Sequence, residues 1–145
     1  EIGGAVWNAL IHGAAGIAYF QHNNNGVCGN YSIIQCGAER TAAIRSINAQ
    51  VTAMAPVLNS PSYSWQFGTG LQTALKVVDD YAYILAMTDG TSGIRSFSLP
   101  PSLRDATAVE VVDEGRSIEV DVGAFVDDFD AEYTHHIYRI ALPGS

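Results

Sequence analysis

The sequence predicts an α+β protein in which a helix–strand–helix segment precedes an antiparallel β-sandwich. Two observations within the 145 residues lead to this prediction. In two early stretches, apolar residues recur every three to four positions, which is the spacing of a helix with one buried face. From about residue 60 onward, apolar residues alternate with polar ones, and turn residues recur every eight to twelve positions, as expected of a β-sandwich.

The first segment combines two expected helices and one expected strand. Residues 2–13 have helical spacing, and Gly13 stands where a glycine commonly ends a helix. The apolar run GIAYF at 16–20 is too short for a helix, so it predicts a strand buried on both faces of a parallel sheet. Residues 38–55 predict a second helix that ends at Pro56. Its buried stripe is Ile44, Ile47, Val51 and Met54.

Six strands are expected in the second segment, at residues 71–78, 81–88, 93–99, 107–112, 116–122 and 134–142. We expect turns at Asp79-Asp80, Asp89-Gly90 and Glu114-Gly115, because such pairs favour tight hairpins. The predicted domains are therefore residues 1–58 and 59–145. A single strand in the first of them would leave its edges unpaired, so we expect something else to cover it.

Composition and charge exclude some functions. The net charge is -8 and only seven residues are Lys or Arg, which argues against a nucleic-acid partner. No window approaches the ~20 consecutive apolar residues of a membrane span. The sequence has neither a GxSxG motif nor a phosphate-binding loop with its lysine. We therefore predict no catalytic residue within this chain, no cofactor and no metal ion.

Both cysteines, Cys28 and Cys36, lie in a loop rich in Gly and Asn. A disulfide between them is plausible and would indicate an oxidising compartment, so we expect an extracellular or secreted protein. The alternative is a pair of free thiols. A zinc site is disfavoured, because neither cysteine belongs to a CxxC pair and His22 alone does not complete a ligand set.

Two stretches carry a resemblance to a known family. VWNALIHGAAGIAYFQHN, near the start, resembles the seventh helix and eighth strand of (β/α)8-barrel retaining glycoside hydrolases, the clan of cellulases and β-galactosidases. VDVGAFVDDFDAEYTHHIYRI, near the end, is similar to the closing strands of the small β-sandwich that follows such barrels. The resemblance implies that residues 1–58 are the last helix–strand–helix of a TIM-type barrel and that residues 59–145 are its trailing sandwich.

The resemblance also locates the expected site. The two catalytic carboxylates of this clan follow the fourth and seventh strands, so both would lie outside this chain. Residues after the last strand line the mouth of the barrel, where active sites form. We therefore expect sugar contacts from Tyr19, Phe20, Gln21, His22 and Asn23. One of the two aromatic residues should instead pack in the core, because neighbouring strand residues point in opposite directions.

Several other residues have two interpretations. The acidic run at 127–132 suggests calcium, but it lacks the pattern of an EF-hand loop, so a solvated turn is favoured. His135 and His136 should point to opposite faces of a strand, which disfavours a metal site. The aromatic residues Tyr63, Trp65 and Phe67 could form a sugar-binding platform, although we expect them to seal a domain interface.

The predicted function is to complete the barrel and sugar-binding mouth of a glycoside hydrolase. Its expected partners are an oligo- or polysaccharide and either the missing part of the barrel or a second copy of the chain. One alternative is a non-catalytic carbohydrate-binding or interaction module, favoured if Tyr63, Trp65 and Tyr83 share one exposed face. Another is a truncated fragment that associates with itself through residues 16–20.

Overall fold

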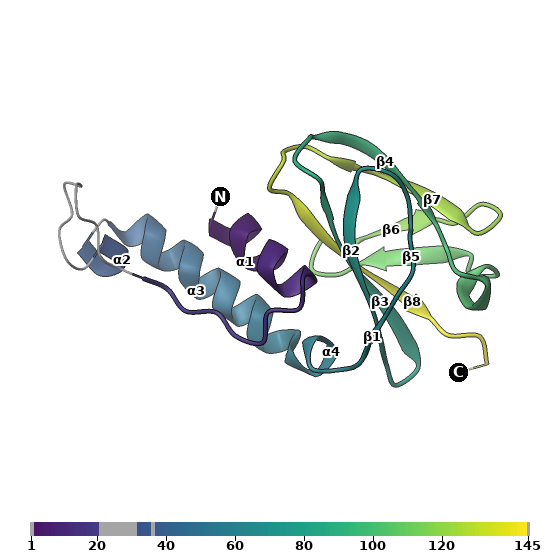
Figure 1. The fold of residues 1–145 in the computed structure, drawn as a ribbon, viewed down its shortest axis with the longest axis horizontal. Helices are drawn as coiled ribbons and strands as arrows, with labels where there is room; N and C mark the ends of the chain where they lie inside the picture. Colours follow the sequence, from purple (N-terminus) through teal and green to yellow (C-terminus); the bar gives the residue numbers. More distant parts are fainter. Residues whose placement is uncertain (1, 21–31, 36, 145) are drawn as a thin grey trace.

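The computed structural model describes residues 2–20, 32–35 and 37–144, and it arranges them as a helical layer beside a β-sandwich (Figure 1). The helices are α1 (Ile2–Ile11), α2 (Ser32–Gln35), α3 (Ala38–Ala53) and α4 (Ala55–Leu58). The strands are β1 (Ser62–Tyr63), β2 (Leu71–Val78), β3 (Tyr81–Thr88), β4 (Gly93–Ser98), β5 (Ala108–Val111), β6 (Arg116–Glu119), β7 (Ala124–Phe129) and β8 (His135–Ala141). No described helix is long and apolar enough to cross a membrane.

Both predicted helices are confirmed. Gly13 follows α1 with a φ of 88°, the left-handed conformation that favours glycine after a helix. The second helix ends at Ala53, and the chain turns at Met54 into the short helix α4. Pro56 lies in the first turn of α4, where its missing N–H costs no helical hydrogen bond. Pro56 therefore lies at the start of α4, whereas we had predicted that it ends the helix at residues 38–55.

The predicted strand at residues 16–20 is not found. This segment leaves α1 and runs back along α3, where the Tyr19 hydroxyl donates to Asn48 Oδ1 at 2.9 Å (Figure 1). A strand needs a neighbour that receives its backbone hydrogen bonds. Among the described residues no strand pairs with this segment, so it remains extended without belonging to a sheet.

The sandwich consists of a six-stranded sheet in the order β1-β2-β3-β8-β5-β6 and a two-stranded sheet of β4 and β7. Every strand pair is antiparallel. Strands β2 and β3 have the predicted bounds and form a hairpin across Asp79, whose φ of 51° suits a tight turn. The predicted turn at Glu114-Gly115 likewise joins β5 to β6.

Two strand-level predictions are wrong. Asp89-Gly90 is not a hairpin turn, because β3 pairs with β2 and β8 whereas β4 pairs with β7; this turn carries the chain from one sheet to the other. The acidic stretch expected to be a solvated turn includes the end of strand β7. Phe125, Asp127 and Phe129 alternate toward the interior there, so the carboxylate lies between two buried rings.

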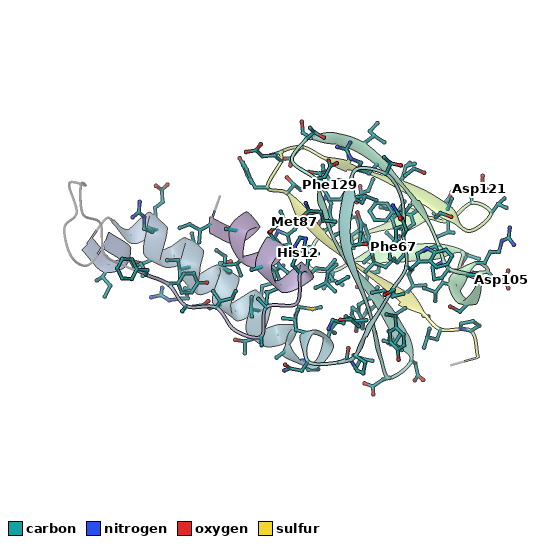
Figure 2. All side chains as sticks on the ribbon, viewed as in Figure 1. His12, Phe67, Met87, Asp105, Asp121 and Phe129 are labelled. Atoms are coloured by element: carbon teal, nitrogen blue, oxygen red, sulfur yellow. The ribbon has the colours of Figure 1, made fainter. Side chains whose placement is uncertain are left out.

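The six-stranded sheet separates two hydrophobic cores, so the molecule has three layers. Strand β3 supplies both cores: Ile84 faces the small sheet, whereas Leu85 and Met87 face the helices. Figure 2 shows Phe67 and Phe129 within the sandwich and Met87 on the side of the helices. Trp7 of α1 is fully buried in the core beneath the helices.

Candidate functional site

The predicted sugar-contacting residues are only partly described. Tyr19 is half-buried and packs toward the core beneath the helices, whereas the side chain of Phe20 is 84% exposed. Gln21, His22 and Asn23 lie outside the described residues, as do Cys28 and Cys36, so the predicted disulfide stays a prediction.

A cluster of charged side chains joins the two sheets of the sandwich. Arg116 on β6 donates two hydrogen bonds to the carboxylate of Asp127 on β7, at 2.9 and 2.8 Å. Its Nε also donates to Glu114 Oε2 at 2.7 Å. The Tyr138 hydroxyl on β8 donates to Asp127 Oδ2 at 2.9 Å. On the same strand, His136 Nδ1 lies 2.5 Å from Glu114 Oε1.

These contacts shift the pKa values of the cluster. Burial alone would raise the pKa of Asp127, but hydrogen bonds from Arg116 and Tyr138 stabilise its carboxylate and lower the pKa overall. The same hydrogen bond from Arg116 to Asp127 raises the pKa of the guanidinium. Burial, followed by the charge of Asp127, raises the pKa of the Tyr138 hydroxyl. Asp127 and Arg116 therefore remain a charged pair at neutral pH.

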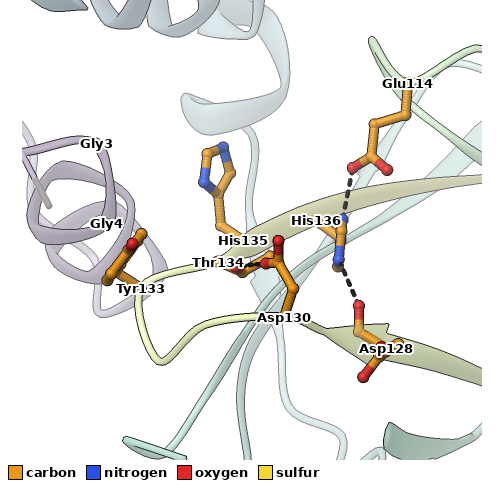
Figure 3. A pocket seen from close by; sticks show the side chains of 9 residues that line it. All are labelled: Gly3, Gly4, Glu114, Asp128, Asp130, Tyr133, Thr134, His135 and His136. Atoms are coloured by element: carbon orange, nitrogen blue, oxygen red, sulfur yellow. Dashed lines mark hydrogen bonds and ion pairs between the residues drawn. The ribbon is translucent and has the colours of Figure 1, made fainter. Parts of the chain in front are cut away.

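Beside this cluster is an open pocket of about 550 Å³ (Figure 3). It is lined by Gly3, Gly4, Glu114, Asp128, Asp130, Tyr133, Thr134, His135 and His136. Its polar groups are largely engaged with one another: His136 lies between Glu114 and the Asp128 carbonyl, and Thr134 donates to Asp130 (Figure 3). No set of three potential metal ligands comes together among the described residues. The pocket therefore lies where several elements of the fold meet, and two of its titratable side chains, Glu114 and His136, are paired with each other.

The neighbouring His135 connects the sandwich to the helices. Its ring stacks on Trp7 of α1, with centroids 4.9 Å apart and planes inclined by 17°. Gln50 Oε1 on α3 lies 3.3 Å from His135 Nε2 and accepts a 2.9 Å hydrogen bond from Trp7 Nε1. Burial, with a smaller contribution from the charge of His136, lowers the pKa of His135 to about 4. As predicted, the two histidines point to opposite sides of the sheet: His135 contacts Trp7, whereas His136 contacts Phe129.

The three aromatic residues at 63–67 differ in burial and do not form one surface. Phe67 is buried in the sandwich core, whereas Tyr63 is 53% exposed and Trp65 is 39% exposed. The expectation that all three seal an interface is therefore wrong for Tyr63 and Trp65. Tyr83 is half-buried against the core beneath the helices, so it does not share their exposed face. Tyr63 and Trp65 line a second concavity, of about 600 Å³, on the surface.

The sequence did not reveal the Arg116–Asp127–Tyr138 cluster. A signal was present in the motif FVDDF, where Asp127 stands midway between two phenylalanines with period two. A carboxylate on an inward-facing position requires a cationic or hydrogen-bonding partner. A solvated turn at residues 127–132 would need no partner for the Asp127 carboxylate, so that expectation pointed to none.

Comparison with known proteins gives a likeness in fold alone. No family model matches the chain, and no curated protein matches it. Among solved structures, the α-amylase of Geobacillus thermoleovorans in complex with acarbose is similar over 98% of this chain, with a TM-score of 0.66 and 13% identity. An Anoxybacillus α-amylase, described as a new glycosyl hydrolase subclass, is similar over 81% of it, with a TM-score of 0.57 and 14% identity.

A third solved structure, AmyP in complex with maltotriose, is similar over 79% of the chain, with a TM-score of 0.59 and 14% identity. The chain spans 33%, 25% and 23% of the lengths of these three structures. It is therefore similar in fold to a part of larger glycoside hydrolases, and that part is an α+β unit with a β-sandwich-like domain.

Proposed function

We propose that this chain is the C-terminal part of a secreted retaining glycoside hydrolase. In this proposal, residues 1–58 complete a (β/α)8 barrel and residues 59–145 form the sandwich that supports it. The parent enzyme hydrolyses O-glycosidic bonds of an oligo- or polysaccharide with two carboxylates about 5–5.5 Å apart. Both carboxylates belong to barrel strands outside this chain, and the chain alone is inactive.

One observation carries the proposal. The segment AAGIAYF at 14–20 is composed of apolar residues and glycine, yet most of it lies at the surface and pairs with no described strand. A sequence of this kind is normally buried, and a contiguous exposed apolar patch commonly marks a surface that another element covers. The strands of a barrel would cover this segment on both edges and convert it into the eighth strand. The likeness to part of much longer hydrolases supports the same arrangement.

The barrel arrangement also gives the predicted sugar contacts a role. The residues that follow the last strand lie at its C-terminal mouth, where residues 20–23 would meet the substrate. Phe20, which is largely exposed in this chain, would present its ring to a sugar face. Tyr19 already packs toward the core and would keep that position.

The decisive experiment measures the polypeptide that carries this sequence in its native source. We expect peptide mapping and intact mass to find it in a polypeptide, or a complex, large enough to hold a barrel of roughly 250 residues. That material should hydrolyse at least one member of a panel of 4-nitrophenyl glycosides. If the native protein is only the 15.5 kDa chain, as a monomer or homo-oligomer, the proposal fails. A homo-oligomer whose interface includes residues 16–20 would instead support the self-associating fragment.

The secreted location has its own test. An oxidising compartment should leave Cys28 and Cys36 as a disulfide. Iodoacetamide should then label neither cysteine in the denatured native protein until a reductant is added. Labelling of both cysteines without reductant would contradict the disulfide and remove the support for secretion.

A further inference from the structure

The concavity beside β1 is a distinct surface of the sandwich. It is lined by Ile11, Ser62, Tyr63, Ser64, Trp65, Gln66, Thr73 and Ala74. None of these side chains carries a charge at neutral pH, in a protein whose overall charge is -8. Its volume of about 600 Å³ lies within the range of small-molecule sites, roughly 300–1,000 Å³.

The sheet opens at this point because β1 is short. Strand β1 pairs with β2 only through Ser62–Lys76 and Tyr63–Leu75. The chain then leaves the sheet edge and reaches the sandwich core at Phe67. Residues 64–66 consequently line the concavity together with Thr73 and Ala74 of β2.

Two aromatic rings line this opening. The indole Nε1 of Trp65 donates to the Ser98 carbonyl at 2.8 Å, which fixes the ring while 39% of the residue stays exposed. Tyr63 is 53% exposed, and among the described residues its hydroxyl has no hydrogen-bond partner. A fixed aromatic ring loses little conformational entropy when a ligand stacks on it.

We propose that this concavity binds a neutral glycan, at a site separate from the barrel mouth. The C–H face of a pyranose ring would pack on the exposed faces of Trp65 and Tyr63, because such faces are apolar and weakly negative. The sugar hydroxyls would exchange hydrogen bonds with Gln66, Thr73 and the free Tyr63 hydroxyl. The proposed site acts by binding, since its lining holds no carboxylate, histidine or lysine, and the proposal does not depend on the chain being part of a hydrolase.

The lining disfavours other ligand classes. A phosphorylated or carboxylated ligand requires Lys or Arg, and neither lines the concavity. A cationic ligand would find no carboxylate in the lining. A neutral polyhydroxylated molecule matches a surface that combines aromatic rings with uncharged hydroxyl and amide groups.

Isothermal titration calorimetry on the purified protein tests the assignment. Maltotriose and cellotriose serve as neutral probes, and trigalacturonic acid serves as a charged probe of similar size. We expect saturable binding of at least one neutral trisaccharide and weaker binding of the acid. Tyr63→Ala and Trp65→Ala should each weaken the binding by about tenfold or more, because each removes a stacking face. Tyr81→Ala is the matched control, since this tyrosine is 38% exposed but lies outside the concavity.

Circular dichroism of each variant establishes that it is folded. Tyr63→Ala is the cleaner variant, because it deletes an exposed ring and no described hydrogen bond, whereas Trp65→Ala also frees the Ser98 carbonyl. Absence of binding to both neutral probes up to about 10 mM would overturn the assignment. Binding that survives both substitutions would overturn it as well. The mass of the native polypeptide decides the hydrolase proposal independently of either result.

Discussion

The sandwich and the helical layer bury their apolar residues in different ways. In the sandwich, Phe97 is fully buried and its ring stacks on Phe125 at 4.5 Å and meets Tyr138 edge-on at 5.1 Å. Both sides of that core come from the sandwich itself. The helical layer buries Trp7 only by packing on the outer face of the sheet, and its segment 14–20 stays largely exposed. The inner core of the sandwich is therefore enclosed by its own strands, whereas the helices depend on a surface that other elements provide.

The largest expected effect is in the sandwich core. Phe97→Ala should lower the free energy of unfolding by about 3–5 kcal/mol, because it leaves a cavity among packed aromatic rings. Urea denaturation followed by circular dichroism measures the change. Ile94→Ala on the same strand is the control: this side chain is 72% exposed, so a loss within about 0.5 kcal/mol is expected. Similar losses in both variants would show that the small sheet does not enclose a core.

The second effect concerns the contact between the two regions. Because the pKa of His135 is lowered to about 4 when folded, protonation favours the unfolded chain, in which a histidine titrates near 6.5. Stability should therefore be lost as pH falls from about 6.5 toward 4, by up to about 3 kcal/mol from this residue. His135→Gln should flatten this part of the curve of unfolding free energy against pH. An unchanged slope would mean that His135 is not buried between Trp7 and the sheet.

A slightly smaller effect is expected from the charged cluster within the sandwich. Asp127→Ala should cost about 2–3 kcal/mol, because it leaves Arg116 and the buried Tyr138 hydroxyl without their shared partner. Asp128→Ala is a matched control, since the adjacent carboxylate is exposed. Thermal unfolding compares the two variants. Equal melting temperatures would show that the cluster does not join β6, β7 and β8.

The smallest effect tests how closely α1 docks. A Cβ at Gly4 would lie 2.5 Å from the Cβ of Tyr133 and 2.9 Å from its carbonyl oxygen, so Gly4→Ala should push the helix away and cost about 1–3 kcal/mol. A Cβ at Gly3 would meet only Ile47, at 3.7 Å. Gly3→Ala should therefore stabilise α1 by up to about 1 kcal/mol, through helix propensity. Opposite shifts of the melting temperature are expected, and shifts of the same sign would contradict this docking.

The elements that sequence predicted best are those whose pattern is local. Strands β2 and β3 are joined directly by the short turn at Asp79-Asp80, so a nearby turn fixes their pairing. The pairing partner of β4 was not predictable in this way, because this partner, β7, lies about thirty residues further along the chain. Strand β7 was not predicted, because the charged Asp127 occupies one of its inward-facing positions. That position is explained only by the hydrogen bonds that Arg116 and Tyr138 donate to the carboxylate.

The candidate sites show the same limit. The helix that carries Trp7 was predicted, but the stacking of Trp7 on His135 joins residues more than 120 positions apart. The exposure of Tyr63 and Trp65 follows from the shortness of β1, which no periodicity in the sequence reveals. For residues 16–20 the apolar pattern is clear, but a strand also needs neighbours, and no described strand pairs with this segment.

The position of β8 has a consequence for synthesis on the ribosome. This strand lies between β3 and β5, so it alone joins β1–β3 to β5–β6 in the large sheet. It is also the last strand of the described chain to be translated. Until residues 135–141 leave the exit tunnel, the nascent chain holds two partial sheets with unpaired edges, and such edges invite aggregation. Translation of residues 135–141 therefore completes the large sheet and removes these unpaired edges.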